Sequence, residues 1–282
     1  MITEKAFAKI NLTLSVGQKR NDGYHDIDSV MHSISLCDEI TLTEATEISF
    51  AVKRGTAPEG KANLMWDAAE LFFRETGFSG GVHMELVKQI PSEAGMGGGS
   101  SDAAAVLRGL NRMTGQQLSL MALADMGAKL GADVPFCVSG GCRRCEGIGE
   151  KLTPLAGWAG LPVVIVRPGV SISTGKAYGL LDVCPRRRAG TAESCIEALK
   201  NKDRAALMAS LSNDFEDVLF KAEPVLGETF SYLSSLCKKA MMTGSGSAFF
   251  LMVENEVQQR KLAAEIKEER PQWYVGTAET IL

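Results

Sequence analysis

The sequence predicts an α+β protein with two domains, and three observations support this prediction. Short alternating or continuously apolar runs, typical of strands, are interspersed with longer segments whose apolar residues recur at helical spacing. At 282 residues the chain is long enough for two domains with separate cores. The stretch GWAGLP at 157–162 follows a pair of short strands and precedes a buried one. We therefore expect one domain at 1–156 and a second at 157–282.

The expected elements share either the alternation of a half-buried strand or the spacing of an amphipathic helix. In the first domain they are strands at 5–16, 82–91, 142–149 and 150–155, one or two strands within 27–44, and helices at 63–77, from about 103, and at 119–131. In the second domain they are strands at 163–168 and 247–254, helices at 191–200 and 223–239, and a final helix followed by a strand. Ser119 suits a helix start, and Gly77 and Gly131 suit helix ends.

The stretch PSEAGMGGGSSDAA at 91–104 places four glycines in five positions, between an expected strand and an expected helix. Glycine at this density costs conformational entropy on folding. We expect Ser100 or Ser101 to cap the helix, so that the glycines lie where unpaired backbone N–H groups point outward. Such a terminus binds anions, and the bare backbone lets a phosphate group approach. A glycine-rich hinge is the alternative, but a linker normally has polar flanks.

This loop differs from two other phosphate-binding motifs. The Walker motif requires a lysine directly after the last glycine, and the dinucleotide motif requires glycine or alanine at its sixth place. Here Ser100 occupies that position. A near match to the Walker motif at 169–177 has one residue too many between its glycines and ends on Ala177, where Ser or Thr belongs. The loop at 91–104 instead resembles the ATP-binding loop of the GHMP kinases.

Further segments resemble one branch of the GHMP kinases, in the order that the branch has them. They are AKINL at 8–12, NDGYHDIDSVMHSISLCDEI at 21–40, LGADVPF at 130–136, EGIGEKLTPL at 146–155 and PGVSISTGKAY at 168–178. The resemblance runs from residue 6 to about residue 250. It implies a two-domain GHMP kinase fold, with an α/β N-terminal domain like ribosomal protein S5 and a ferredoxin-like α+β C-terminal domain.

Two candidate catalytic residues are ambiguous from their spacing alone. Lys9 lies in an apolar strand, where a lysine is commonly an edge residue whose amine reaches solvent, with Asn11 on the same face. Asp133 precedes Val134-Pro135, which predicts extended backbone, and it suits an Asx turn or a cap equally well. The resemblance implies that Lys9 and Asp133 form the catalytic pair. Asp133 would then be the general base, and Lys9 the cation that keeps the carboxylate ionised and stabilises charge on the attacking oxygen.

The resemblance also implies an ATP site, with Mg²⁺ bound to the nucleotide. The positions that match the ATP-binding loop are Ser92, Glu93, Ala94, Gly95, Met96, Gly97, Gly98, Gly99, Ser100, Ser101 and Asp102. Some relatives carry asparagine at position 102, so a magnesium-binding role of Asp102 stays open and no metal ligand is assigned. The segment MTGSGSAFF at 241–249 matches a third GHMP motif, whose glycines are expected to pack beside the phosphate loop. A tight turn before a core strand is a compatible interpretation of the same segment.

The substrate that the resemblance implies is a small molecule, a cytidine diphosphate-linked methylerythritol, whose 2-hydroxyl would be phosphorylated on the non-mevalonate route to isoprenoid precursors. Asn11 matches a residue that positions the substrate or the phosphates. Tyr24 and His25 match residues that hold the cytosine, and Tyr178 aligns with the second aromatic that stacks on it. A flat aromatic ring stacks on a base, and a histidine can bind the edge of a pyrimidine.

Composition and charge restrict the partners that we expect. A net charge of −4 argues against a nucleic-acid partner, and the basic run at 186–188 suits a solvated loop. No apolar stretch reaches the length of a membrane span and no leader sequence is evident, so we expect a cytoplasmic protein that does not bind membranes. Seven cysteines in no regular pattern fit a reducing compartment, and Cys142 and Cys145 suit structural roles better than a zinc site. The oligomeric state is open, with a homodimer as one possibility.

Three competing functions remain from the sequence. One is a GHMP kinase for another small alcohol, such as homoserine or mevalonate, which DGYH and the early AKINL disfavour. A second is a decarboxylase of the same superfamily, for which no distinctive motif is present. A third is a catalytically inactive binding protein with this fold, and the presence of Lys9, Asp133 and the intact loop argues against it.

Overall fold

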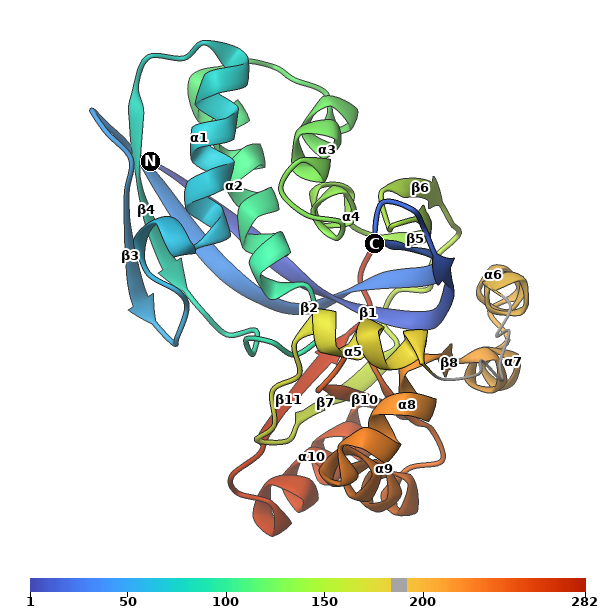
Figure 1. Ribbon diagram of the computed structural model, residues 1–282. Helices are drawn as coiled ribbons and strands as arrows, with labels where there is room; N and C mark the ends of the chain where they lie inside the picture. The colour runs from blue at the N-terminus through green and yellow to red at the C-terminus, as the bar shows by residue number, and fades with distance from the viewer. Residues whose placement is uncertain (184–191) are drawn as a thin grey trace. The chain divides into compact units, whose positions relative to one another are not determined.

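The computed structural model describes residues 1–183 and 192–282, so the basic run at 186–188 lies outside the described residues (Figure 1). The strands are β1 (Ile2–Lys19), β2 (His25–Ala45), β3 (Ser49–Arg54), β4 (Gly81–Val87), β5 (Cys142–Gly147), β6 (Lys151–Pro154), β7 (Pro162–Arg167), β8 (Ser212–Asn213), β9 (Ala240–Met242), β10 (Phe249–Met252) and β11 (Tyr274–Glu279). The helices are η1 (Gly60–Ala62, a 3-10 turn), α1 (Leu64–Thr76), α2 (Gly98–Thr114), α3 (Leu120–Ala128), α4 (Val134–Ser139), α5 (Thr174–Asp182), α6 (Ala192–Asn201), α7 (Arg204–Ser210), α8 (Phe215–Ala222), α9 (Pro224–Leu236) and α10 (Glu256–Glu269).

The chain divides into two compact units that interleave along the sequence. The first unit comprises 1–8, 36–92 and 97–140, and the second comprises 9–35, 93–96 and 141–282. The long strands β1 and β2 each contribute residues to both units. The mixture of sheets and helices confirms the predicted α+β class. The expected domain boundary at 156/157 stays a prediction.

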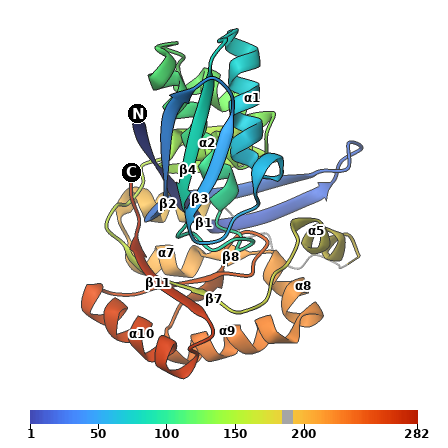
Figure 2. The ribbon, with the colours of Figure 1, turned by 90° about the vertical axis from the view of Figure 1, so that its left-hand side faces the viewer.

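The first unit is a small sheet with helices packed together beside it. Residues 39–45 of β2 pair antiparallel with β4, and β4 pairs parallel with β3. Helix α1 packs along α2, as Figures 1 and 2 show, and α4 packs against α2 and α3. Asn63 accepts a hydrogen bond from the Met65 amide at the start of α1, and Gly77 ends the helix in the left-handed region, as predicted.

The second unit contains an antiparallel sheet in the order β11-β7-β10-β9. Its central strands are almost completely apolar, which explains the continuous runs VVIV and FFLM in the sequence, and their side chains are buried. Helix α10 packs against β7 and β11, and α9 packs against β9 (Figure 2). The first half of β2 pairs with β5, β6 pairs with β5, and β8 pairs with β1. No helix among the described residues is both long and apolar enough to cross a membrane.

Candidate active site

The middle of the predicted phosphate loop, residues 93–96, lies against the third motif within the second unit. The Ala248 amide donates to the Ala94 carbonyl at 3.2 Å. Gly95 adopts φ +71°, and a Cβ there would lie 2.2 Å from the Thr243 carbonyl oxygen. A Cβ at Gly244 would lie 2.6 Å from the Gly95 carbonyl oxygen. Backbone therefore packs directly on backbone, which requires glycine at both positions and confirms that the motif at 241–249 packs beside the loop.

Lys9 is hydrogen-bonded to this loop and to Asn11. Its backbone amide donates to the Met96 carbonyl at 3.1 Å, and its Nζ donates to Asn11 Oδ1 at 2.8 Å. The residue is only 3% exposed, so the expectation that such a lysine reaches solvent from a sheet edge is wrong here. Asn11 Nδ2 donates to Ser29 Oγ at 2.8 Å, and the Asn11 amide donates to Thr243 Oγ1 at 3.1 Å. Lys9, Asn11, the loop and the third motif thus form one hydrogen-bonded cluster.

The candidate cytosine residues also lie in the second unit, but the sequence missed one member of the group. His25 is 4% exposed, and its ring stacks on Tyr178 with ring centroids 5.0 Å apart and 26° between the planes. Tyr178 in turn packs edge-on against Phe215 at 5.0 Å. His25 Nε2 lies 2.7 Å from Asp182 Oδ1. Tyr24 is 59% exposed beside this pair in sequence. Asp182 follows Tyr178 by four residues on α5, the spacing that could have indicated it.

The carboxyl part of the phosphate loop belongs to the first unit, where α2 starts earlier than predicted. The helix begins at Gly98 with Gly97 as its N-cap at φ 68°, so the expectation that Ser100 or Ser101 caps it is wrong. Ser101 Oγ instead donates to the Phe7 carbonyl at 2.6 Å, which removes it as a cap. A Cβ at Gly99 would meet no atom within 4 Å. The helix terminus therefore offers bare backbone at the glycines themselves.

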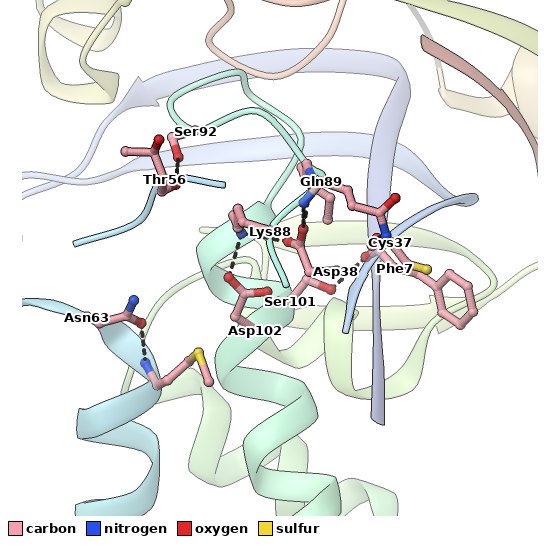
Figure 3. A network of polar contacts seen from close by, with 12 residues as sticks. Phe7, Cys37, Asp38, Thr56, Asn63, Lys88, Gln89, Ser92, Ser101 and Asp102 are labelled. Carbon is pink, nitrogen blue, oxygen red and sulfur yellow. Dashed lines mark hydrogen bonds and ion pairs between the residues drawn. The ribbon is translucent and has the colours of Figure 1, made fainter. Parts of the chain in front are cut away.

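A buried cluster of one lysine and two aspartates supports the loop from within the first unit, and Figure 3 shows it. Lys88 Nζ donates to Asp38 Oδ2 at 2.6 Å and to Asp102 Oδ2 at 2.5 Å. Asp38 Oδ1 also accepts from the backbone amides of Gln89 and Ile90, at 2.5 and 2.8 Å. Asp38 thus fixes the chain just ahead of the loop, and Asp102 fixes the first turn of α2 to the same lysine.

Burial dominates the electrostatics of this cluster. It raises the pKa of Asp102 to about 8, since the pull of Lys88 in the other direction is the smaller effect and Asp38 adds repulsion. Burial alone would lower the pKa of Lys88, but the carboxyl groups of Asp102 and Asp38 outweigh it and raise the pKa. Asp102 Oδ1 is buried and has no hydrogen-bond partner among the described residues. A carboxyl held by lysine and shifted toward its neutral form is a poor magnesium ligand, so Asp102 does not fit a metal site.

Asp133 lies in the first unit at the N-cap position of α4. Its φ of −83° and ψ of −15° are right-handed helical values, so the predicted extended backbone is wrong. The chain enters a new helix at Val134 because Pro135 lies in the first turn, where a missing N–H costs no helical hydrogen bond. No group of three or more His, Cys, Asp and Glu side chains that could bind a metal occurs in the part of the chain that the structure describes.

Comparison with known proteins identifies the family. The model of the GHMP kinases N terminal domain matches residues 63–141, and that of the GHMP kinases C terminal domain matches 195–272. A 4-diphosphocytidyl-2-C-methyl-D-erythritol kinase of Exiguobacterium sibiricum is 39% identical over 93% of this chain and 92% of that protein. The chain belongs to this family of GHMP kinases. A second family member, from Moorella thermoacetica, is 38% identical over 98% of both chains.

Solved structures agree with this assignment to the 4-diphosphocytidyl-2-C-methyl-D-erythritol kinase family. A crystal structure of 4-(cytidine 5'-diphospho)-2C-methyl-D-erythritol kinase matches 98% of this chain and 99% of its own, with a TM-score of 0.82 and 34% identity. A homoserine kinase from Cytophaga hutchinsonii matches 99% of this chain and 95% of its own with a TM-score of 0.74 but 16% identity, which shows a shared fold alone. As a member of this kinase family, the chain is a phosphotransferase that uses ATP.

Proposed function

We propose that the chain transfers the γ-phosphoryl group of ATP to the 2-hydroxyl of 4-diphosphocytidyl-2-C-methyl-D-erythritol, a step toward isoprenoid precursors. Relatives that carry this name are 38–39% identical over most of the chain, and they supply the substrate. The structural observation that carries the proposal is the hydrogen bond from the Lys9 amide to the Met96 carbonyl. It ties the candidate catalytic lysine directly to the backbone of the candidate ATP-binding loop.

In this proposal Asp133 accepts the proton of the substrate 2-hydroxyl as the oxygen attacks the γ-phosphorus. Lys9 supplies a positive charge that favours the ionised form of the carboxylate and stabilises negative charge on the attacking oxygen. Asn11 supports the assignment of Lys9, because its Oδ1 accepts from Lys9 Nζ and its Nδ2 is fixed by Ser29. The amine is thereby held in one direction instead of sampling many rotamers.

ATP would bind along residues 92–102, with its phosphates at the N-terminus of α2, where the free amides and the helix dipole attract anions. The open space at Gly99 supports this placement. We propose that Mg²⁺ enters with the nucleotide, where it screens the phosphate oxygens. Magnesium is commonly held by phosphate oxygens and water together with one or two carboxylates, and none of the described carboxylates is assigned to it.

Tyr24, His25 and Tyr178 would hold the cytosine of the substrate. The stacking of His25 on Tyr178 supports this proposal, because it gathers an imidazole edge and an aromatic face in one place. The exposed ring of Tyr24 is free to close on a base from the other side. The net charge of −4 gives no reason to expect nucleic acid as a partner, and we further propose a cytoplasmic location. A homodimer remains one possible assembly.

A coupled assay of ADP release tests the proposal. The purified chain is offered 4-diphosphocytidyl-2-C-methyl-D-erythritol, homoserine and mevalonate in turn, each with ATP and Mg²⁺. We expect turnover with the cytidylyl substrate alone, and its loss when Asp133 is changed to Asn. Turnover with homoserine or mevalonate would identify a different GHMP kinase. ATP binding without turnover of any of the three alcohols would favour an inactive binding protein.

A further inference from the structure

Helix α5 presents two side chains to the same imidazole. Tyr178 and Asp182 are four residues apart, so they lie one turn apart on one face of the helix. Tyr178 stacks on the His25 ring, and Asp182 Oδ1 lies 2.7 Å from His25 Nε2. The other oxygen of Asp182, Oδ2, accepts from Lys19 Nζ at 2.7 Å. His25 is therefore fixed both in the plane of its ring and at one of its two nitrogens.

The contact with Asp182 decides which nitrogen carries the proton. Hydrogen bonds from Lys19, and next from His25, lower the pKa of Asp182, so its carboxylate is ionised and can only accept. His25 Nε2 must then be the donor. In the neutral imidazole this leaves a lone pair on Nδ1, which can only accept. Nδ1 has no hydrogen-bond partner among the described residues, and it is not one of the fully buried polar atoms that lack one.

The geometry of the two rings fits a base at Nδ1. A base that is hydrogen-bonded in the plane of the imidazole shares that plane. It then lies within about 26° of parallel to the Tyr178 ring, because this is the angle between the His25 and Tyr178 planes. Such near-parallel rings can stack. Nδ1 and the Tyr178 face can therefore bind the edge and the face of the same pyrimidine.

We propose that Asp182 is a positioning residue that sets the preference for cytosine over uracil, by holding His25 with its proton on Nε2 and its lone pair on Nδ1. The exocyclic amino group of cytosine donates to that lone pair. Uracil carries a carbonyl oxygen at the same ring position and would face the lone pair with no proton between them. This inference rests on the proposed function, since it assumes that the ligand is a cytidylyl compound. A purely structural ion pair that closes α5 onto β2 would have no effect on base preference.

The test compares Asp182→Ala with Asp26→Ala. Asp26 is the matched control, since it is a neighbouring carboxylate that bonds Arg20 and not the His25 ring. Inhibition by CMP and by UMP is measured for each, together with the Michaelis constants for the cytidylyl substrate and for ATP. In Asp182→Ala we expect the preference for CMP to fall by about tenfold, the scale of one hydrogen bond to a charged or well-oriented group. The Michaelis constant for ATP should stay unchanged, as should the base preference of Asp26→Ala.

A spectroscopic measurement gives a second readout that does not depend on a variant folding. The chain has three histidines, and His25→Gln identifies the His25 signals in an imidazole ¹⁵N spectrum of the wild type. We expect a protonated Nε2 and an unprotonated Nδ1 at the assay pH. A protonated Nδ1 would overturn the inference, and so would an Asp182→Ala variant that keeps the CMP preference. If the wild type turns over the cytidylyl substrate, either result leaves the proposed function intact. A wild type with no turnover of that substrate and no preference for CMP would overturn both.

Discussion

The buried carboxyl of Asp102 makes a sharp prediction about stability and pH. Its pKa rises from 3.8 to about 8 in the folded chain. Between those values the folded state holds a proton that the unfolded state has released, so the free energy of unfolding falls as pH rises through this window. A single site of this kind lowers stability by about 1.4 kcal/mol per pH unit. From pH 5 to pH 7 the loss from this group amounts to about 3 kcal/mol.

Asp102→Asn removes the titration and preserves the shape. The amide oxygen of asparagine can still accept from Lys88 Nζ, as Asp102 Oδ2 does now. Urea unfolding at pH 5, 6 and 7 measures the stability of the wild type, of Asp102→Asn and of Asp26→Asn, an exposed aspartate that serves as control. We expect the variant to gain on the wild type by up to about 3 kcal/mol between pH 5 and pH 7. The control should run parallel to the wild type.

A wild type and an Asp102→Asn variant with parallel pH dependence would refute this reasoning. Equal slopes would mean that Asp102 is ionised in the folded chain across the whole range, and that Lys88 offsets the cost of burial in full. A variant that loses stability steadily relative to the wild type as pH rises would reverse the sign. Because other carboxyls titrate alike in the two proteins, the difference between the two curves isolates position 102.

Four further predictions follow from the site. Asp133→Asn should lower turnover by ~10²-fold or more with little change in ATP affinity, and adding Lys9→Ala should cost little beyond either single change, as turnover rates will show. Gly99→Val should abolish ATP binding in calorimetry while the chain stays folded, because its side chain would occupy open space beside the helix terminus; wild-type affinity would contradict it. Tyr24→Ala should raise the Michaelis constant for the cytidylyl substrate by roughly ten- to a hundredfold and leave that for ATP unchanged; equal effects on both would contradict base stacking. Lys88→Met should cost about 3–5 kcal/mol in urea unfolding, because it leaves a buried carboxylate without its partner.

The sequence predicts the core elements well because their patterns are local. The apolar runs of β7 and β10 and the capped, periodic segment of α1 each contain enough information to define an element. The glycine loop is equally local, and its fit to the third motif was foreseen because both segments contain glycine where backbone must approach backbone. Residues 27–44, expected as one or two strands, lie within one strand, β2.

Other features could not be predicted because they depend on partners far along the chain. Ser101 has the chemistry of a helix cap, yet its hydroxyl bonds to Phe7, a residue 94 positions away, and no local rule indicates that competition. Lys9 was expected to reach solvent because an isolated strand reveals nothing about what covers it. Asp182 was missed because its carboxylate acts on His25, 157 positions earlier, and a polar residue at a helix end usually needs no such explanation.

The hydrogen bond from Asn11 to Thr243 joins residues 232 positions apart, and it bears on how the chain acquires activity during synthesis. The loop residue Gly95 leaves the ribosome 148 positions before Thr243, which accepts the Asn11 amide and contacts the Gly95 carbonyl. At ordinary rates of translation this gap lasts on the order of ten to thirty seconds. Through that interval the nascent loop lacks the segment that backs it, since contacts of high sequence separation form late. A ribosome stalled shortly before residue 243 would therefore carry an almost complete chain that cannot yet hold its nucleotide loop in place.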